Sequence, residues 1–222
     1  MPPPSYLLLE IPTMKSLFAV ALLALGAVAS AQTAHMYEQE RPLAAGGAVV
    51  LTLNVGDVSI LPSGSDRIRL EIHTNRPVDQ ETMAGWIQRF EIAGNRATID
   101  IHVPKWEYNC ANDCGSGVTL FVPEQSDLQV GLGVGDMTIR GVQGNKDVST
   151  GVGDLRISVA NPSDYGHVET HTRIGDIHDF LNHGSDQSGI LGNTEDFILS
   201  GRYHLKASTG IGDVHISEDG KS

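Results

Sequence analysis

A Gly-Asp pair recurs along this chain, each time between aliphatic residues, and it constrains the fold more than any other feature. The first copy reads Val55-Gly56-Asp57-Val58, and four further copies follow the same pattern at glycine intervals of 79, 18, 22 and 37 residues. The last interval contains Gly192-Asn193, which we interpret as a weaker sixth copy. The predicted turn residues are therefore Gly56, Asp57, Gly135, Asp136, Gly153, Asp154, Gly175, Asp176, Gly192, Asn193, Gly212 and Asp213.

The residues around each pair predict strands that meet at corners. After each Asp, apolar and polar residues alternate, as in Val58-Ser59-Ile60, which is typical of a half-buried strand. Glycine adopts backbone conformations that other residues avoid, and an Asp side chain can accept a bond from a nearby main-chain amide. We expect the residue before each glycine and the residue after each Asp to face the core, with the next position facing solvent.

The regular spacing of the pairs predicts how the strands assemble. A unit of about 20 residues cannot bury its own apolar face, whereas stacked units can. We therefore expect an all-β fold, favouring a β-solenoid with coils of about 20 residues. A β-sandwich with short strands and regular turns is the alternative.

The long interval between the first two copies has a different pattern. Apolar residues at helical spacing follow Asp79 and Thr82, either of which can cap the start of a helix. Two alternating runs then flank Gly94-Asn95, which is a favourable hairpin turn. We expect a short helix and a hairpin inserted in the repeats near residues 75–115.

The N-terminal region has the layout of a secretory signal peptide. Met14-Lys15-Ser16 forms a charged start, residues 17–28 are apolar, and Ala29-Ser30-Ala31 is a small-residue cleavage site. We expect residues 1–31 to be a mis-assigned extension followed by the signal peptide, so that the protein is exported to the periplasm or outside the cell. The remaining chain is predicted to comprise a linker at 32–47, one β-repeat domain at 48–217 and a tail at 218–222.

Two cysteines, Cys110 and Cys114, lie close together in the expected insertion. In an exported protein, such an isolated pair favours a disulfide that closes a small loop. A redox pair would more usually have two intervening residues, and a zinc site would need further ligands nearby.

The charge of the chain argues against two classes of partner. The formal net charge is −12, and the sequence has no run of lysine and arginine. A phosphate-binding footprint is therefore missing, which argues against nucleic acid and against anionic membrane surfaces.

Catalytic motifs are missing from the sequence as well. It contains no nucleophile elbow, zinc-protease motif or phosphate loop, so we assign no catalytic residue and no cofactor. Stacked carboxylates could bind calcium, with Asp136, Asp154 and Asp176 as weak candidates, although capping of turns explains them better. His178 and His215 share an outward column, but the sixth copy would place one coil between them.

Several of these segments together resemble a known family. The run Val122-Pro123-Glu124 and the units Ser149–Asp154 and Ser208–Asp213 are similar to bacterial domains described as putative adhesins of unknown function. The resemblance covers roughly residues 48–217 and implies a β-helix-like fold, export and a cell-envelope setting. It implies no catalytic residue. The chain departs from the pattern at His171-Thr172-Arg173, where Ser-Thr-Gly is expected.

These observations predict a non-catalytic, exported binding module that presents an acidic β-solenoid surface. Its partner would be a protein or glycan of the cell envelope, without insertion into the membrane. Unpaired solenoid ends would also allow a homo-oligomer. Two alternatives stay open: a polysaccharide-acting β-helix enzyme and a structural repeat domain stabilised by calcium.

Overall fold

The computed structural model describes residues 33–104, 115–181, 185–188 and 192–219, and these residues form an all-β structure with one short α-helix. The elements in chain order are β1 (Thr33–Pro42), β2 (Gly47–Val55), β3 (Asp57–Pro62), β4 (Arg67–Asp79), α1 (Gln80–Trp86), β5 (Ile87–Ala93), β6 (Arg96–Ile101), β7 (Ser116–Val122), β8 (Ser126–Val134), β9 (Met137–Arg140), β10 (Lys146–Val152), β11 (Leu155–Val159), a 3-10 turn η1 (Pro162–Asp164), β12 (Tyr165–Ile174), β13 (Ile177–Asp179), β14 (Ser185–Gln187), β15 (Asn193–Ile198), β16 (Tyr203–Ile211) and β17 (Val214–Glu218).

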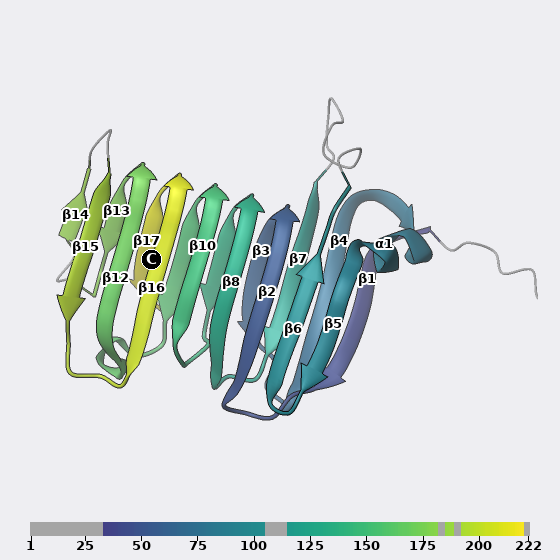
Figure 1. The fold of residues 1–222 in the computed structure, drawn as a ribbon, viewed down its shortest axis with the longest axis horizontal. Helices are drawn as coiled ribbons and strands as arrows, with labels where there is room; N and C mark the ends of the chain where they lie inside the picture. Colours follow the sequence, from purple (N-terminus) through teal and green to yellow (C-terminus); the bar gives the residue numbers. More distant parts are fainter. Residues whose placement is uncertain (1–32, 105–114, 182–184, 189–191, 220–222) are drawn as a thin grey trace, which may run out of the picture. The chain divides into compact units, whose positions relative to one another are not determined.

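The strands form two mixed sheets (Figure 1). Sheet A contains nine described strands in the order β1-β4-β7-β3-β9-β11-β17-β13-β14. Sheet B contains eight, in the order β15-β12-β16-β10-β8-β2-β6-β5. The central strands of both sheets are parallel, whereas the edge strands β1, β5, β14 and β15 pair antiparallel, and β4 is antiparallel to both β1 and β7. The all-β class expected from the sequence is therefore confirmed.

At each of the five Gly-Asp pairs the chain passes from sheet B to sheet A. The connected strands are β2 and β3, β8 and β9, β10 and β11, β12 and β13, and β16 and β17. Neighbouring strands pair in parallel with the repeats in register, so that Val55, Val134 and Val152 are direct partners. The repeats that the sequence aligns are thus aligned in space as well.

The order of the repeats in space differs from their order in the chain. The last repeat, β16 and β17, lies between the third and fourth repeats, because β16 pairs with β10 on one side and β12 on the other. After the fourth repeat, β14 and β15 turn back antiparallel and occupy the sheet edges. The final repeat therefore enters the sheets at an internal position, and not at the end that a sequential stack would leave for it.

The core lies between the two sheets. The residue after each Asp is at most 1% exposed, and it belongs to the same buried cluster as inward-facing aliphatic residues of sheet B such as Leu51 and Val148. Full burial of one such side chain stabilises the fold by about 1.5–3 kcal/mol. The buried residues that follow the Asp are Val58, Met137, Leu155, Ile177 and Val214.

The expected helix and hairpin are present after β4. Asp79 caps α1, because its side chain accepts a hydrogen bond from the Thr82 main-chain N–H at 2.7 Å. β5 and β6 form an antiparallel hairpin around Gly94, whose φ is 60°. No helix in the described parts of the chain is long and apolar enough to span a membrane.

One boundary expected from the sequence is wrong. Residues 33–42, expected to belong to a linker, form β1, which pairs antiparallel with β4 along the edge of sheet A. Tyr37 of this strand packs against the core, so burial of an aromatic side chain holds the segment to the sheet.

Candidate binding surface

The five Gly-Asp corners stack along one rim where the two sheets meet. Their glycines have φ values of 119°, 138°, 136°, 140° and 139° in chain order. A Cβ added to Gly153 would overlap the carbonyl oxygen of Gly135, and the same holds for Gly135 against Gly56. Each corner therefore packs backbone on backbone against the next, and only glycine fits both the conformation and the space.

The Asp side chains link these corners to one another. In spatial order, the Oδ1 atoms of four Asp residues each accept a hydrogen bond from the next Asp main-chain N–H, at 2.8–3.0 Å. Each carboxylate thus satisfies a main-chain donor that the turn would otherwise leave unpaired. We call this set the Asp row; it comprises Asp57, Asp136, Asp154, Asp213 and Asp176.

An arginine pairs with the middle of the Asp row. Arg156 lies 2.8 Å from Oδ2 of Asp154 and 3.5 Å from Oδ2 of Asp136. All three side chains are partly exposed, so the pairs are screened by water and each contributes at most about 1 kcal/mol. The arginine therefore offsets part of the charge of the row and leaves the row acidic.

Four of the five residues before the corner glycines are on the surface, where the sequence predicted that they face the core, whereas the fifth, Val55, packs against the core as expected. Val134, Val152, Ile174 and Ile211 are 43–49% exposed, and Val55 is half-buried. The chain crosses from sheet B to sheet A within the two residues of each Gly-Asp corner. The residue before the glycine therefore lies at the rim, beyond the last residue of the strand that is buried between the sheets. Register places these side chains on adjacent strands as an aliphatic ladder, in the order Val55, Val134, Val152, Ile211 and Ile174.

This aliphatic ladder is an unusual surface. Single exposed aliphatic residues are common, but a contiguous exposed apolar patch rimmed by polar groups marks an interaction site. Here one apolar side chain stands on each of five adjacent strands, and the Asp row follows two residues later in every corner. Apolar and acidic groups thus run side by side along the same rim.

Gly192-Asn193 does not build a corner of this kind. Gly192 has a φ of 61°, and Asn193 opens β15, which runs antiparallel to β12. The Asn193 side chain donates a hydrogen bond to the Gly175 carbonyl at 2.7 Å. The segment predicted as a sixth copy therefore borders the fourth corner and does not repeat it.

Because that extra repeat is missing, His178 and His215 lie on adjacent strands. Their rings stack with centroids 4.7 Å apart and planes tilted by 15°, which corrects the expectation that one coil separates them. Burial lowers the pKa of His215, and the nearby His178 and Arg156 lower that pKa further. The stacked rings lie outward on sheet A, beside the acidic rim.

A buried lysine was missed at the sequence level. Lys146 lies at an inward position between Leu128 and Leu205, and it is fully buried. Its ammonium group donates to the carbonyl oxygen of Val142 at 2.7 Å and to the Tyr165 hydroxyl. Burial lowers the pKa of Lys146 to about 8. Aligning the inward columns of the repeats would have revealed this lysine.

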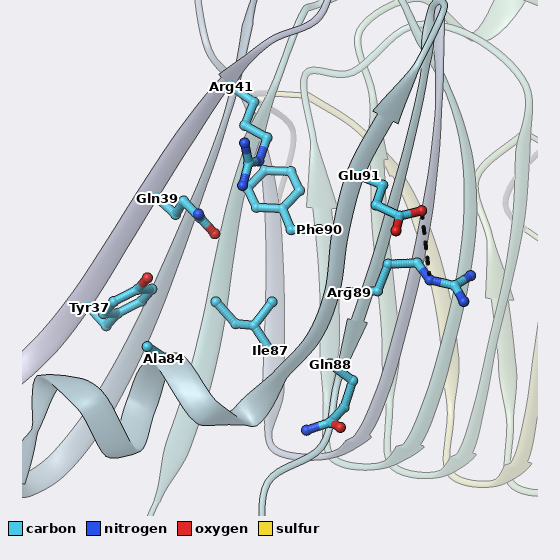
Figure 2. Close-up of a pocket in the computed structure, with 9 residues that line it drawn as sticks. All are labelled: Tyr37, Gln39, Arg41, Ala84, Ile87, Gln88, Arg89, Phe90 and Glu91. Atoms are coloured by element: carbon cyan, nitrogen blue, oxygen red, sulfur yellow. Dashed lines mark ion pairs between the residues drawn. The ribbon is translucent and has the colours of Figure 1, made fainter.

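A groove of about 330 Å³ lies between β1 and β5, at the edges of the two sheets (Figure 2). Tyr37, Ile87 and Phe90 contribute its apolar surface, and the Arg41 guanidinium lies 5.0 Å from the centre of the Phe90 ring. The carboxylate among the lining residues is Glu91, which lies 3.9 Å from Arg89. The groove therefore offers no pair of convergent carboxylates for acid–base chemistry.

The predicted disulfide and the weak calcium candidates are the remaining predicted sites. Cys110 and Cys114 lie outside the described residues, so the disulfide stays a prediction. Within the described ranges, no group of three or more His, Cys, Asp or Glu residues could hold a metal ion. Asp136, Asp154 and Asp176 all belong to the Asp row, in which Asp136 and Asp154 accept main-chain hydrogen bonds from the next corner.

Comparison with known proteins adds information on the fold. No family model and no curated protein matches the chain. A crystal structure of a putative cell adhesion protein from Clostridium sporogenes superposes with a TM-score of 0.52 at 14% identity, covering 85% of this chain and 100% of that one. The two proteins share a fold.

Two further solved structures are less similar. A putative adhesin from Parabacteroides merdae gives a TM-score of 0.26 at 13% identity, covering 56% of this chain and 52% of that chain. A putative lipid binding protein from Parabacteroides distasonis gives a TM-score of 0.25 at 9% identity, covering 83% of this chain and 96% of that chain. These scores are too low to relate the folds.

Proposed function

We propose that this protein is a non-catalytic, adhesin-like binding module, exported to the periplasm or the cell exterior, that recognises a protein or glycan of the cell envelope. The observation that carries the proposal is the exposed aliphatic ladder beside the Asp row. A soluble domain gains no stability from exposed aliphatic side chains aligned on neighbouring strands, whereas a binding partner would remove them from water.

The stacking of the repeats supports a β-solenoid-like reading of the fold. Each Gly-Asp repeat contributes one strand to each sheet, and neighbouring repeats pair in parallel and in register. Such repetition produces an extended surface with the same chemistry on each unit, which suits recognition of an extended partner.

The chemistry of the rim supports a binding role more than a catalytic one. Asp57, Asp136, Asp154 and Asp213 already accept main-chain hydrogen bonds, which hold the corners together. A carboxylate pair for hydrolysis would instead converge on one substrate atom, with one member kept protonated by its surroundings. The fold shared with the Clostridium sporogenes protein, described as a putative cell adhesion protein, is in keeping with this role.

The test is binding to an envelope fraction by a variant that lacks the aliphatic ladder. Val134→Ser, Val152→Ser and Ile211→Ser are combined in one protein, and its binding to immobilised envelope of the source bacterium is compared with that of the wild type. We expect at least a tenfold loss. The control is Ile198→Ser, which changes a residue of β15 that is 83% exposed but lies outside the ladder. Equal loss in both variants, or no loss in the ladder variant, would contradict the proposal.

A further inference from the structure

We propose that the aliphatic ladder docks an amphipathic α-helix that carries lysine or arginine along one flank. This inference rests on the proposed function, because it specifies the partner of the same surface. The spacing of the ladder, the glycines beside it and the charge of the Asp row support such a partner.

The spacing of the ladder matches a helix that lies across the strands. Neighbouring strands are about 4.8 Å apart, so five rungs extend over about 19 Å. A helix advances about 5.4 Å per turn. A helix with one apolar residue per turn would therefore keep each of these residues within about 2–3 Å of a ladder side chain over all five strands. An extended strand repeats its same-face side chains at about 6.7 Å and loses register after one or two rungs.

The surface on one side of the ladder allows a helix to approach closely. Gly133, Gly151 and Gly210 precede the ladder residues of β8, β10 and β16, and register places them on adjacent strands. Added Cβ atoms at these positions would meet a neighbouring main-chain carbonyl oxygen. On these three strands the packing of the repeats keeps the strip beside the ladder free of side chains, whereas Asn54 of β2 and Arg173 of β12 occupy the equivalent positions at its two ends.

On the other side of the ladder, the acidic Asp row favours a helix with basic side chains. The Asp row follows the ladder along the whole rim, and Arg156 pairs with Asp136 and Asp154. A lysine or arginine once per turn would face an Asp on each repeat. A second copy of this chain would instead bring acidic rim against acidic rim in molecules of net charge −12. An anionic lipid surface is disfavoured for the same reason.

The experiment uses two synthetic helical peptides of about five turns. Both carry leucine once per turn; one carries lysine along a flank beside the leucines, and the other carries glutamate there. Binding to the full chain is measured by fluorescence anisotropy at low and moderate salt. We expect the lysine peptide to bind at least tenfold more tightly than the glutamate peptide, with an affinity that falls as salt rises.

Variants of the protein test each part of the surface. The triple ladder variant Val134→Ser, Val152→Ser, Ile211→Ser should bind the lysine peptide at least tenfold more weakly than the wild type does. The pair Asp57→Asn and Asp213→Asn removes charge but keeps an oxygen acceptor at each corner, so it should weaken binding by several fold and flatten the salt dependence. Ile198→Ser should bind as the wild type does. Circular dichroism verifies that each variant is folded.

Each other outcome overturns the inference in a recognisable way. If the ladder variant binds the lysine peptide as tightly as the wild type does, the helix does not dock there. If both peptides bind equally, the Asp row does not select charge. A dimer that the ladder variant abolishes would identify a second copy as the occupant. If envelope binding needs the ladder but the lysine peptide does not compete, the proposed function stands and the helical partner is wrong.

Discussion

Gly153 illustrates what a corner demands of a single residue. Its φ of 136° is a conformation that residues with a Cβ rarely adopt, and an added methyl group would overlap the backbone of the neighbouring corner. Neither problem can be relieved by moving a flexible side chain, because the obstructing atom is a main-chain oxygen. The repeat glycines are therefore required by packing between repeats as well as by the local turn.

We predict that Gly153→Ala lowers the free energy of unfolding by at least about 3 kcal/mol, because strain in the backbone and steric overlap add. Gly131→Ala is the matched control. Gly131 lies on β8, and a Cβ added there would meet open space, so this change should alter stability by less than about 0.5 kcal/mol. Urea denaturation of both variants measures the difference, and equal effects would show that the corner geometry is not the cause.

Lys146 makes stability depend on pH in the alkaline range. Its pKa falls from 10.5 to about 8 in the folded protein, because burial penalises the charged ammonium group. Between these values the unfolded chain holds a proton that the native protein has released, so stability rises with pH, by up to about 3 kcal/mol. Burial raises the pKa of Tyr165, so above about pH 10 the unfolded tyrosine ionises first and stability falls again.

We predict that Lys146→Met removes the rise in stability between about pH 8 and pH 10. Methionine fills a similar volume and carries no charge, so the variant stays folded although two carbonyl oxygens and the Tyr165 hydroxyl lose a donor. Lys206→Met is the control, because Lys206 is exposed and its pKa is raised by Glu169. Urea denaturation across this pH range measures the free energy of unfolding of each variant. If this free energy still rises with pH in Lys146→Met, the rise does not come from Lys146.

At the scale of elements, buried threonines tie the strands of sheet B to the corners beside them. The hydroxyl of Thr209 in β16 donates to the carbonyl oxygen of Gly153 at 3.0 Å, and Thr172 in β12 donates to that of Gly212 at 3.0 Å. Thr150 in β10 makes the equivalent bond to Gly135 at 3.3 Å. The threonine two residues before the ladder residue of each of these three strands thus satisfies a carbonyl oxygen of a neighbouring repeat, also in His171-Thr172-Arg173, where the Ser-Thr-Gly pattern is broken.

We predict that Thr209→Val lowers the free energy of unfolding by about 1–2 kcal/mol, because it leaves the Gly153 carbonyl oxygen without this donor while preserving side-chain shape. Thr52→Val is a suitable control, since Thr52 lies on the exposed face of β2. Thermal unfolding followed by circular dichroism compares the two. A control that destabilises as much as Thr209→Val would mean that the hydroxyl bond contributes nothing.

At the scale of the whole molecule, the position of the last repeat makes both sheets depend on the C-terminal strands. β16 and β17 lie between the third and fourth repeats in sheets B and A. Without them, β10 and β12 would lose their shared neighbour, and so would β11 and β13. In a strictly sequential stack, loss of the last repeat would expose only one end.

We predict that deletion of residues 202–222 abolishes cooperative unfolding, because it leaves four internal strand edges unpaired. Deletion of residues 220–222 alone should leave the melting transition in place. Differential scanning calorimetry and limited proteolysis measure both proteins. A cooperative transition in the longer deletion would show that the fourth repeat folds without the fifth.

The sequence alone determined the features that depend on neighbouring residues. Alternation after each Asp predicted the strands, Gly-Asp predicted where the chain turns, and Gly94-Asn95 marked the hairpin, while the cap of the helix was left between Asp79 and Thr82. These patterns follow from the preferences of short segments, which act before any long-range contact forms. The all-β class and the polar outward column followed from the same reasoning.

Only the tertiary structure decided which segments become neighbours. Periodicity states which side chains share a face, but it contains no information on which parallel strand lies beside another. The internal place of the last repeat and the stacked pair His178 and His215 both depend on that pairing. Exposure of the residue before each glycine depends on where two sheets converge. The Gly-Asp repeat was thus visible in the sequence, whereas the surface it builds emerged only from the packing of one repeat against the next.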